Sequence, residues 1–346
     1  MKPRIRFTFL LALLFLVMAF AGVSHGQEVD TPEQVQDRID LLIYAEKGAG
    51  GIIRRLEKIE TDLFGRELPG SIAERQSGLL NFISNGTLGQ PSLIFKAGLA
   101  EWAIAHEVRP DLPLASRVTE IERQLEGEAA EGRPLAMRLE RVLTLLFPGQ
   151  VLWQDVNVPA NLVFKATFID RVSPRNAAAG DVVRLKLEDN LAVEGFLVAP
   201  KGSRVIARVD VVKPPRSFGR PSEIKFAFER LEPLGPEAIP VFVGDASALA
   251  AKSDTTVATA IGTSAIGAIL LGPVGLVGGL LVKGDAPDVA PGTPIYLETA
   301  SATPVKGYAI PPSLQGLPGG VKPPAPQEGT AHEEFEQPME GGDLLE

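Results

Sequence analysis

The chain of 346 residues contains no cysteine, which excludes disulfide bonds, thiolate metal sites and lipid attachment at an N-terminal cysteine. Its formal net charge is −9, which argues against general binding to nucleic acid. The length suits two or three domains, each able to bury a core of its own.

Residues 1–26 have the pattern of an export signal. Basic residues precede a short apolar run at residues 10–20, and small residues precede Gln27. The apolar run is shorter than the roughly 20 residues that span a membrane, although an uncleaved anchor is the alternative. We therefore predict an exported protein of the periplasm or cell envelope, whose mature chain begins near Gln27.

Residues 27–150 are predicted to form an α-helical bundle. Their apolar residues recur with a 4-3-4 spacing, which is typical of one face of an amphipathic helix. The clearest stripes are Ile52, Leu56, Ile59 and Leu63; Leu114, Val118, Ile121 and Leu125; and Leu135, Leu139, Val142 and Leu146. Residues 92–108 are apolar nearly all round, so we place them at the centre of the bundle.

Two of the predicted helices have similar sequences. RLEKIETDLFG, from Arg55, aligns with RLERVLTLLFPG, from Arg138. We expect the arginine and the following glutamate of each copy to lie on a solvated flank, with Leu-Phe closing the helix. The first copy resembles short helical repeats of the form R-L-x-x-[IL]-E-x-x-[LV]-F-G in bacterial envelope proteins. That resemblance implies a packing or interaction module and no catalytic residue.

Residues 151–310 are predicted to form an antiparallel β-domain. Short segments rich in Val, Ile and Phe alternate with polar residues and are separated by turn signals. Six such strands without an intervening helix favour a small barrel or sandwich. The predicted fold class is therefore α+β and multidomain: a helical bundle followed by this β-domain, which carries a Gly-rich hydrophobic hairpin.

The β-domain sequence resembles that of TrbI/VirB10-type secretion-channel proteins. The resemblance lies in VAPKGSRVIARV, where a Pro-Lys-Gly-Ser turn leads into a strand, and in IKFAFERLEPLGPEAIPV, where a strand ends in a proline-bearing turn. It implies an exported β-domain with a hydrophobic helical insertion that reaches a membrane. The chain departs from that family in its cleavable-looking signal and in lacking a long proline-rich stalk.

Residues 255–282 contain no charged residue and form the hydrophobic insertion. As one helix they would run about 42 Å, longer than a hydrocarbon core of roughly 30 Å. Pro273 divides them into arms too short to span, and both flanks are predicted strands that must share a compartment to pair. We therefore predict a hairpin whose small residues let helices approach closely. Packing within the protein and a single membrane span are the alternatives. The candidate residues for membrane contact or self-association are Gly262, Gly267, Gly272, Pro273, Gly275 and Gly279.

Two charged regions remain. Residues 311–346 are rich in Pro and Gly and end in an acidic stretch, which predicts a disordered acidic tail. The β-domain carries basic residues around KPPRSFGR, and these give a candidate anion-binding patch, although an ordinary solvated face is the alternative. Its residues are Arg204, Arg208, Lys213, Arg216 and Arg220.

No sequence motif for catalysis, metal binding or cofactor binding is present. H-E-x-x-H, G-x-S-x-G and P-loop sequences are absent, and only His106 and His332 follow the signal. We therefore predict no cofactor and a non-enzymatic structural or assembly protein of the cell envelope, whose partners are envelope proteins or further copies of itself. The alternatives are a secretion- or channel-associated component that contacts a membrane through residues 255–282, a binder of anionic envelope polymer, and a cell-wall hydrolase with a carboxylate pair assembled by the fold.

Overall fold

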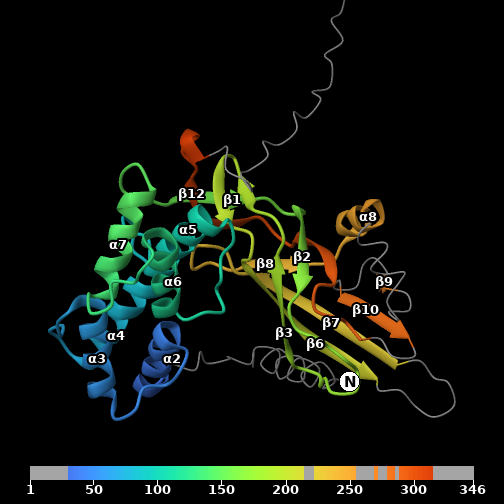
Figure 1. Cartoon of the computed structure of the whole chain (residues 1–346). Coiled ribbons are helices and arrows are strands. Elements are labelled where there is room, and N and C mark those ends of the chain that lie inside the picture. The colour runs from blue at the N-terminus through green and yellow to red at the C-terminus, as the bar shows by residue number, and fades with distance from the viewer. Residues whose placement is uncertain (1–29, 214–221, 255–268, 272–278, 285–287, 315–346) are drawn as a thin grey trace, which may run out of the picture.

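The computed structural model describes residues 30–213, 222–254, 269–271, 279–284 and 288–314. The predicted export signal, most of the insertion and most of the tail lie outside these residues. An α-helical domain occupies one end of the molecule and a β-domain the other (Figure 1). The predicted α+β class is confirmed.

The helical domain consists of two units of three helices. The first contains α2 (Pro32–Tyr44), α3 (Ile52–Phe64) and α4 (Ile72–Leu80), which continues as the π-helical turn η1 (Asn81–Asn85); the second contains α5 (Leu93–Ala105), α6 (Leu114–Glu126) and α7 (Leu135–Leu146). The units correspond in order: α5 begins 61 residues after α2, α6 begins 62 after α3, and α7 begins 63 after α4.

Matching caps set the ends of corresponding helices. Thr31 and Ser92 each precede the first helix of a unit, and each hydroxyl accepts a hydrogen bond from a backbone N–H three residues on. The first helices end in the left-handed conformation at Ala45 and His106, and the second helices end in it at glycine. The correspondence therefore extends to local backbone geometry.

Buried acid–arginine pairs join successive helices of both units. Asp40 accepts from Arg55 Nε at 2.7 Å, and Glu60 accepts from Arg75 Nη2 at 2.6 Å. In the second unit Glu101 pairs with Arg117 at 2.7 Å, and Glu122 pairs with Arg138 at 2.6 Å. Each of the four acids also accepts the backbone N–H of the residue eight positions later. These contacts fix the angle between helices and the loop that connects them.

The predicted solvated position of the two aligned arginines is wrong. Arg55 is 5% exposed and Arg138 is 8% exposed, because each reaches a carboxylate of the preceding helix inside the domain. The glutamate after Leu139, Glu140, is exposed as expected. The stripe residues Leu56 and Leu139 are fully buried, so both helices contribute to the core as predicted.

The β-domain contains a closed six-stranded barrel. Its strands are β2 (Val163–Phe168), β3 (Val182–Leu187), β6 (Arg204–Lys213), β7 (Ser222–Leu231), β8 (Ile239–Phe242) and β11 (Pro294–Thr299), all in antiparallel pairs. They follow the order β6-β3-β2-β11-β8-β7, and β7 returns to β6 to close the barrel. Of the two predicted architectures, the barrel is therefore the one formed.

Apolar side chains alternate along the barrel strands and fill the interior. In β7 the inward residues Ile224, Phe226 and Phe228 are buried, as predicted from their alternation with charged residues. Phe226 meets Phe168 of β2 with ring centroids 5.4 Å apart. The expectation that no helix interrupts the strands is wrong, since α8 (Asp245–Ser253) follows β8 and packs on β11 and β2.

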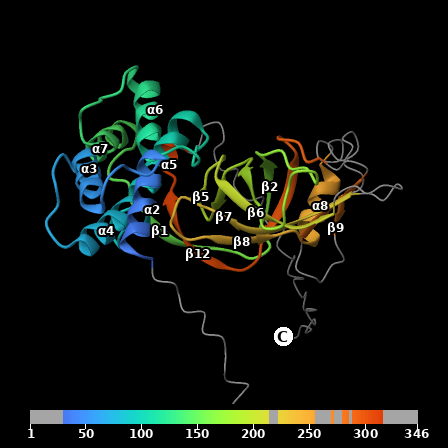
Figure 2. The same cartoon turned by 90° about the horizontal axis from the view of Figure 1, so that it is seen from below.

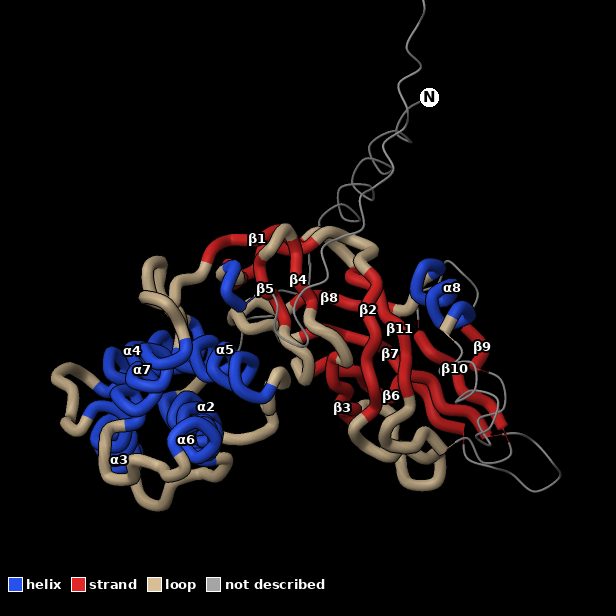
Figure 3. Tube along the Cα trace, turned by 45° about the horizontal axis from the view of Figure 1, so that its top comes forward, coloured by secondary structure: helices blue, strands red, loops and turns tan. Residues whose placement is uncertain are grey.

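A second sheet joins the barrel to the helices (Figures 2 and 3). It has the order β1-β12-β5-β4, from strands β1 (Gln154–Val158), β4 (Leu191–Val193), β5 (Phe196–Ala199) and β12 (Thr303–Ala309). Leu197 of β5 and Tyr308 of β12 belong to the apolar core of the helical domain. Burial raises the pKa of Tyr308 to about 12. Val156 of β1 and Val305 of β12 belong to the barrel core instead, so the sheet contributes side chains to the cores of both domains.

Candidate interaction sites

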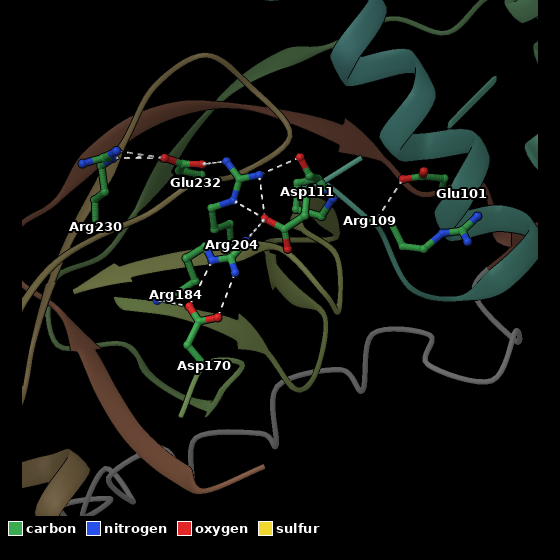
Figure 4. A network of polar contacts seen from close by, with 9 residues as sticks. Glu101, Arg109, Asp111, Asp170, Arg184, Arg204, Arg230 and Glu232 are labelled. Carbon is green, nitrogen blue, oxygen red and sulfur yellow. Dashed lines mark hydrogen bonds and ion pairs between the residues drawn. The ribbon is translucent and has the colours of Figure 1, made fainter. Parts of the chain in front are cut away.

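Arg204 holds the helical domain and the barrel together. It begins β6, and its guanidinium lies 2.9 Å from the carboxylate of Asp111 and donates to the carbonyl of Pro110 at 2.6 Å (Figure 4). A third contact, 3.2 Å to Glu232, ties the same side chain to the loop after β7. One arginine therefore bridges the α5–α6 loop and two parts of the barrel.

Further ion pairs extend this network along β3. Arg184 donates to Asp170 at 2.8 and 3.0 Å, and it lies 3.6 Å from Asp111 (Figure 4). These hydrogen bonds lower the pKa of Asp170 and raise that of Arg184. Lys186 contacts Glu107 at 2.9 Å, and this hydrogen bond raises the pKa of Lys186. The charged groups here satisfy one another across the domain boundary.

The loop that carries Asp111 is itself fixed from the helical side. Arg109 donates its backbone N–H to Glu101, the buried acid of α5, at 3.1 Å. Val108 donates to the carbonyl of Lys201, in the turn before β6, at 2.8 Å. His106 ends α5, and its Nδ1 is buried without a hydrogen-bond partner within the described structure. Backbone hydrogen bonds therefore hold this loop to both domains.

A cleft of about 710 Å³ lies beside this joint. One wall is a face of α2, formed by Gln34, Asp37, Arg38, Leu41, Leu42 and Ala45. The opposite wall is the loop between β7 and β8, residues 232–238, and the floor includes residues 110–114. Because Leu41 and Leu112 are 47% and 40% exposed, the cleft offers apolar surface as well as charges. Sequence reasoning missed it, since its walls come from segments about 200 residues apart.

The described residues of the candidate anion-binding patch all have carboxylate partners. Arg204 is held by Asp111 and Glu232, Arg208 pairs with Glu229, and Lys213 lies 3.2 Å from Glu223. Arg216 and Arg220 lie outside the described residues. The structure thus places the first three along β6, with Arg204 in the domain joint and the other two on the exposed barrel surface. Anion binding by this set stays a prediction.

The hydrophobic insertion extends the barrel by two strands. β10 (Gly279–Gly284) pairs with residues 222–227 of β7, and β9 (Ile269–Leu271) pairs with β10. The described parts of the insertion are therefore strands, and the expectation of close-packed helices is wrong for them. On this edge of β7, β8 pairs only with Arg230 and Leu231. The backbone N–H and C=O groups of residues 222–227 are therefore left for β10 to pair with. Of the candidate glycines and proline, only Gly279 is described; Gly262, Gly267, Gly272, Pro273 and Gly275 lie outside the described residues.

Both flanks of the insertion belong to the barrel. β8 precedes it and β11 follows it, and these strands pair directly at Glu298 with Phe242 and at Thr299 with Val241. Within the described part of the chain, no helix has both the length and the apolar character needed to cross a membrane. The two flanking strands therefore pair with each other, as the sequence predicted.

Comparisons with known proteins assign no family. No family model matches the chain, and no curated protein matches it either. Among solved structures, part of the chain is similar to ComB10 of the Com type IV secretion system of Helicobacter pylori. The identity is 12%, the match covers 41% of this chain and 87% of ComB10, and the TM-score is 0.21. The two proteins are only loosely similar, so neither fold nor function carries over.

Proposed function

We propose that the protein is a non-enzymatic assembly component of the bacterial cell envelope. In this proposal the two domains form one rigid body, and the apolar insertion at residues 255–282 is its contact element for self-association or for other envelope components. The pairing of β8 with β11 is the observation that carries the proposal, because it anchors both ends of the insertion in the barrel.

The joint between the domains supports a scaffold role. Arg204, Arg184 and Lys186 link the barrel to the α5–α6 loop through ion pairs, and Leu197 and Tyr308 of the second sheet belong to the same apolar core as α5. A contact element binds more tightly when the domain that carries it is already ordered, because less conformational entropy is lost on binding. The exported location is part of the proposal and follows from residues 1–26.

Contact with a membrane through the same insertion is the second candidate function. The uncharged sequence of residues 255–282 favours it, whereas the return of the chain to the barrel is inconsistent with a single crossing. Binding of anionic polymer through the basic face has less support, because Arg204, Arg208 and Lys213 already hold carboxylates.

Replacing residues 255–282 by a short Gly/Ser linker tests the proposal. We expect the barrel to remain folded, because its six-strand closure does not use β9 or β10 and loop closure costs little extra per residue. Self-association on gel filtration and recovery with washed membranes should both fall. Leu249→Ser, which removes an exposed leucine of α8 outside the insertion, is the control and should change neither.

Unchanged association after this replacement would contradict the proposed contact element. Carbonate washing of membranes separates the two candidate functions: recovery in the wash favours protein assembly, and recovery only with detergent favours insertion into the bilayer. Circular dichroism on each variant distinguishes loss of contact from loss of folding.

A further inference from the structure

Corresponding helices of the two units face different surroundings. In α5, Gly98 and Trp102 are buried, and Gly98 lies against Leu234 of the β-domain. A Cβ at Gly98 would lie 2.6 Å from a methyl group of Leu234, which shows how closely the loop after β7 approaches this helix. The first unit has the same helix, but no element of the β-domain closes over the corresponding face of α2 in the described structure.

The open face of α2 is the wall of the cleft. Counting back 61 residues, Gly98 corresponds to Asp37 and Trp102 corresponds to Leu41. Trp102 is 1% exposed, whereas Leu41 is 47% exposed and borders the cleft of about 710 Å³. A position that carries a covered apolar side chain in one unit is therefore open in the other. This identifies the α2 face as a docking surface that the fold itself leaves free.

The charges of the cleft favour an acidic occupant. Its carboxylates are already engaged: Asp37 by Arg55 and Lys47, Asp111 by Arg204, and Glu232 by Arg204 and Arg230. Hydrogen bonds from Lys47 and then from Arg55 hold the pKa of Asp37 below its usual range. Cations of the protein itself therefore balance the charges of Asp37, Asp111 and Glu232, while Glu237 in the same lining accepts the backbone N–H of Lys306.

Cationic groups of the cleft remain available to a ligand. Arg38 is exposed and has no ion pair within the described ranges of the chain. The side chain of Lys47 is 64% exposed and that of Arg230 is 40% exposed, so both remain partly accessible despite their contacts with carboxylates. Together with Leu41 and Leu112 they match a peptide that combines acidic residues with a few apolar ones.

We propose that this cleft binds the C-terminal segment of the same chain, residues 328–346. The sequence EGTAHEEFEQPMEGGDLLE contains seven acidic residues, no lysine or arginine, and the apolar residues Phe335, Leu344 and Leu345. Its charge complements Arg38, Lys47 and Arg230, and its leucines match the apolar wall. The inference is independent of the proposed function, because it uses neither the insertion nor export.

The length of the chain permits this contact. The last described residue, Leu314, packs against the apolar core of the helical domain. Residues 315–327 then precede the acidic segment, and 13 extended residues span up to about 45 Å. A helix of 13 residues is about 20 Å long, so the connection can cross the helical domain from one side to the other.

Cross-linking within the full-length chain tests the proposal. Because the protein has no cysteine, introduced cysteines are the only thiols. The variant Leu41→Cys/Leu344→Cys places one thiol on the cleft wall and one in the tail. The control Leu249→Cys/Leu344→Cys uses an exposed leucine of α8 instead. With a short bismaleimide in dilute solution, we expect the cleft pair to form the intramolecular link at least about tenfold faster, because docking raises the local thiol concentration.

Charge reversal supplies the second measurement. Arg38→Glu should slow the cleft cross-link, and changing Glu333, Glu334 and Glu336 to lysine in that background should restore it. Arg54→Glu, an exposed arginine of α3 outside the cleft, is the matched control and should leave the rate unchanged. Melting curves of the variants confirm that the fold is retained.

Equal rates for the cleft pair and the α8 pair would overturn the proposal. Exclusively intermolecular products, detected as cross-linked dimers, would assign the cleft to the tail of a second copy and would equally refute binding within one chain. Failure of this test would leave the proposed assembly role untouched, since that role is measured on the insertion.

Discussion

The buried pair Glu101–Arg117 gives a direct measure of what holds the helical repeat together. Arg117 of α6 donates to both carboxylate oxygens of Glu101 in α5, at 3.0 and 2.7 Å, and the side chains are 5% and 1% exposed. Arg117→Met keeps much of the aliphatic volume and removes the charge. The carboxylate of Glu101 then retains only the backbone N–H of Arg109.

The expected loss of unfolding free energy is about 3–5 kcal/mol, because an uncompensated charge remains buried. Arg141–Glu126 is the matched control. It joins the next two helices, α6 and α7, with a contact of 2.6 Å, but its side chains are 49% and 20% exposed. Arg141→Met should therefore cost only about 0–1 kcal/mol, as for other solvated ion pairs.

Urea unfolding followed by tryptophan fluorescence measures both effects. The only two tryptophans, Trp102 and Trp153, belong to the core of the helical domain, so fluorescence reports this domain. The double variant Glu101→Leu/Arg117→Met should be more stable than Arg117→Met alone. It should still lose about 1–3 kcal/mol, because the Arg109 amide loses its acceptor.

Two results would refute this reasoning. Equal small losses for Arg117→Met and Arg141→Met would mean that burial does not decide the energy of these pairs. The second result concerns additivity. If the stability loss of the double variant equals the sum of the losses of Glu101→Leu and Arg117→Met, the two side chains do not act as a pair.

Three further predictions concern stability. Leu56→Ala and Leu139→Ala should each lower the free energy of unfolding by about 2–5 kcal/mol in urea titrations, since both side chains are fully buried. Gly78→Ala in α4 should raise it by about 0.5–1 kcal/mol, because an added Cβ would meet no atom within 4 Å and helical backbone entropy is reduced. Arg184 holds the pKa of Asp170 below its ordinary value of 3.8. The pair therefore stabilises the fold above that pH, and this stabilisation is lost as the pH falls through the lowered pKa. Melting temperatures of Asp170→Asn should accordingly fall less on acidification than those of the parent.

The secondary structure was predictable because its signals are local. The 4-3-4 stripes placed α3, α6 and α7, and the period-two alternation placed β6 and β7. The pairing of β8 with β11 was also predictable, since strand-like sequences on both sides of the insertion have to share a compartment. The helix α8 was missed, although its alanine-rich sequence favours a helix, because nine residues between strands are too few to show a clear stripe.

The positions of charged residues could not be predicted from one segment at a time. Arg55 lies beside Leu56 in a stripe, and an arginine there is usually solvated. Its burial depends on Asp40, fifteen residues earlier, which reaches the same interior position from α2. The signal that could have revealed it is the recurrence of an acid followed by an arginine 15 or 16 residues later, four times in the helical domain.

The conformation of the insertion depends on the barrel as well as on the sequence of the insertion itself. Small residues at every fourth position, Ala260, Ser264, Ala268 and Gly272, are compatible with packed helices. Leu280 and Val282 nevertheless pair with Phe226 and Ile224 of β7. The sequence contains no information about a free strand edge, because that edge exists only after β8 has turned away from β7. A local pattern thus predicted the apolar excursion correctly and its conformation incorrectly.

Substitutions at corresponding positions explain why the two units of the helical domain have different neighbours. Gly98 lets the loop after β7 approach α5, whereas Asp37 at the corresponding position of α2 would place a charge against Leu234. Burying Asp37, even with its partners Lys47 and Arg55, costs more than burying Gly98, so the α2 face is less suited than that of α5 to permanent cover by this loop. The same frame of acid–arginine pairs therefore supports one face suited to permanent burial and one suited to reversible contact. That difference makes the α2 face the first place at which to look for a binding partner.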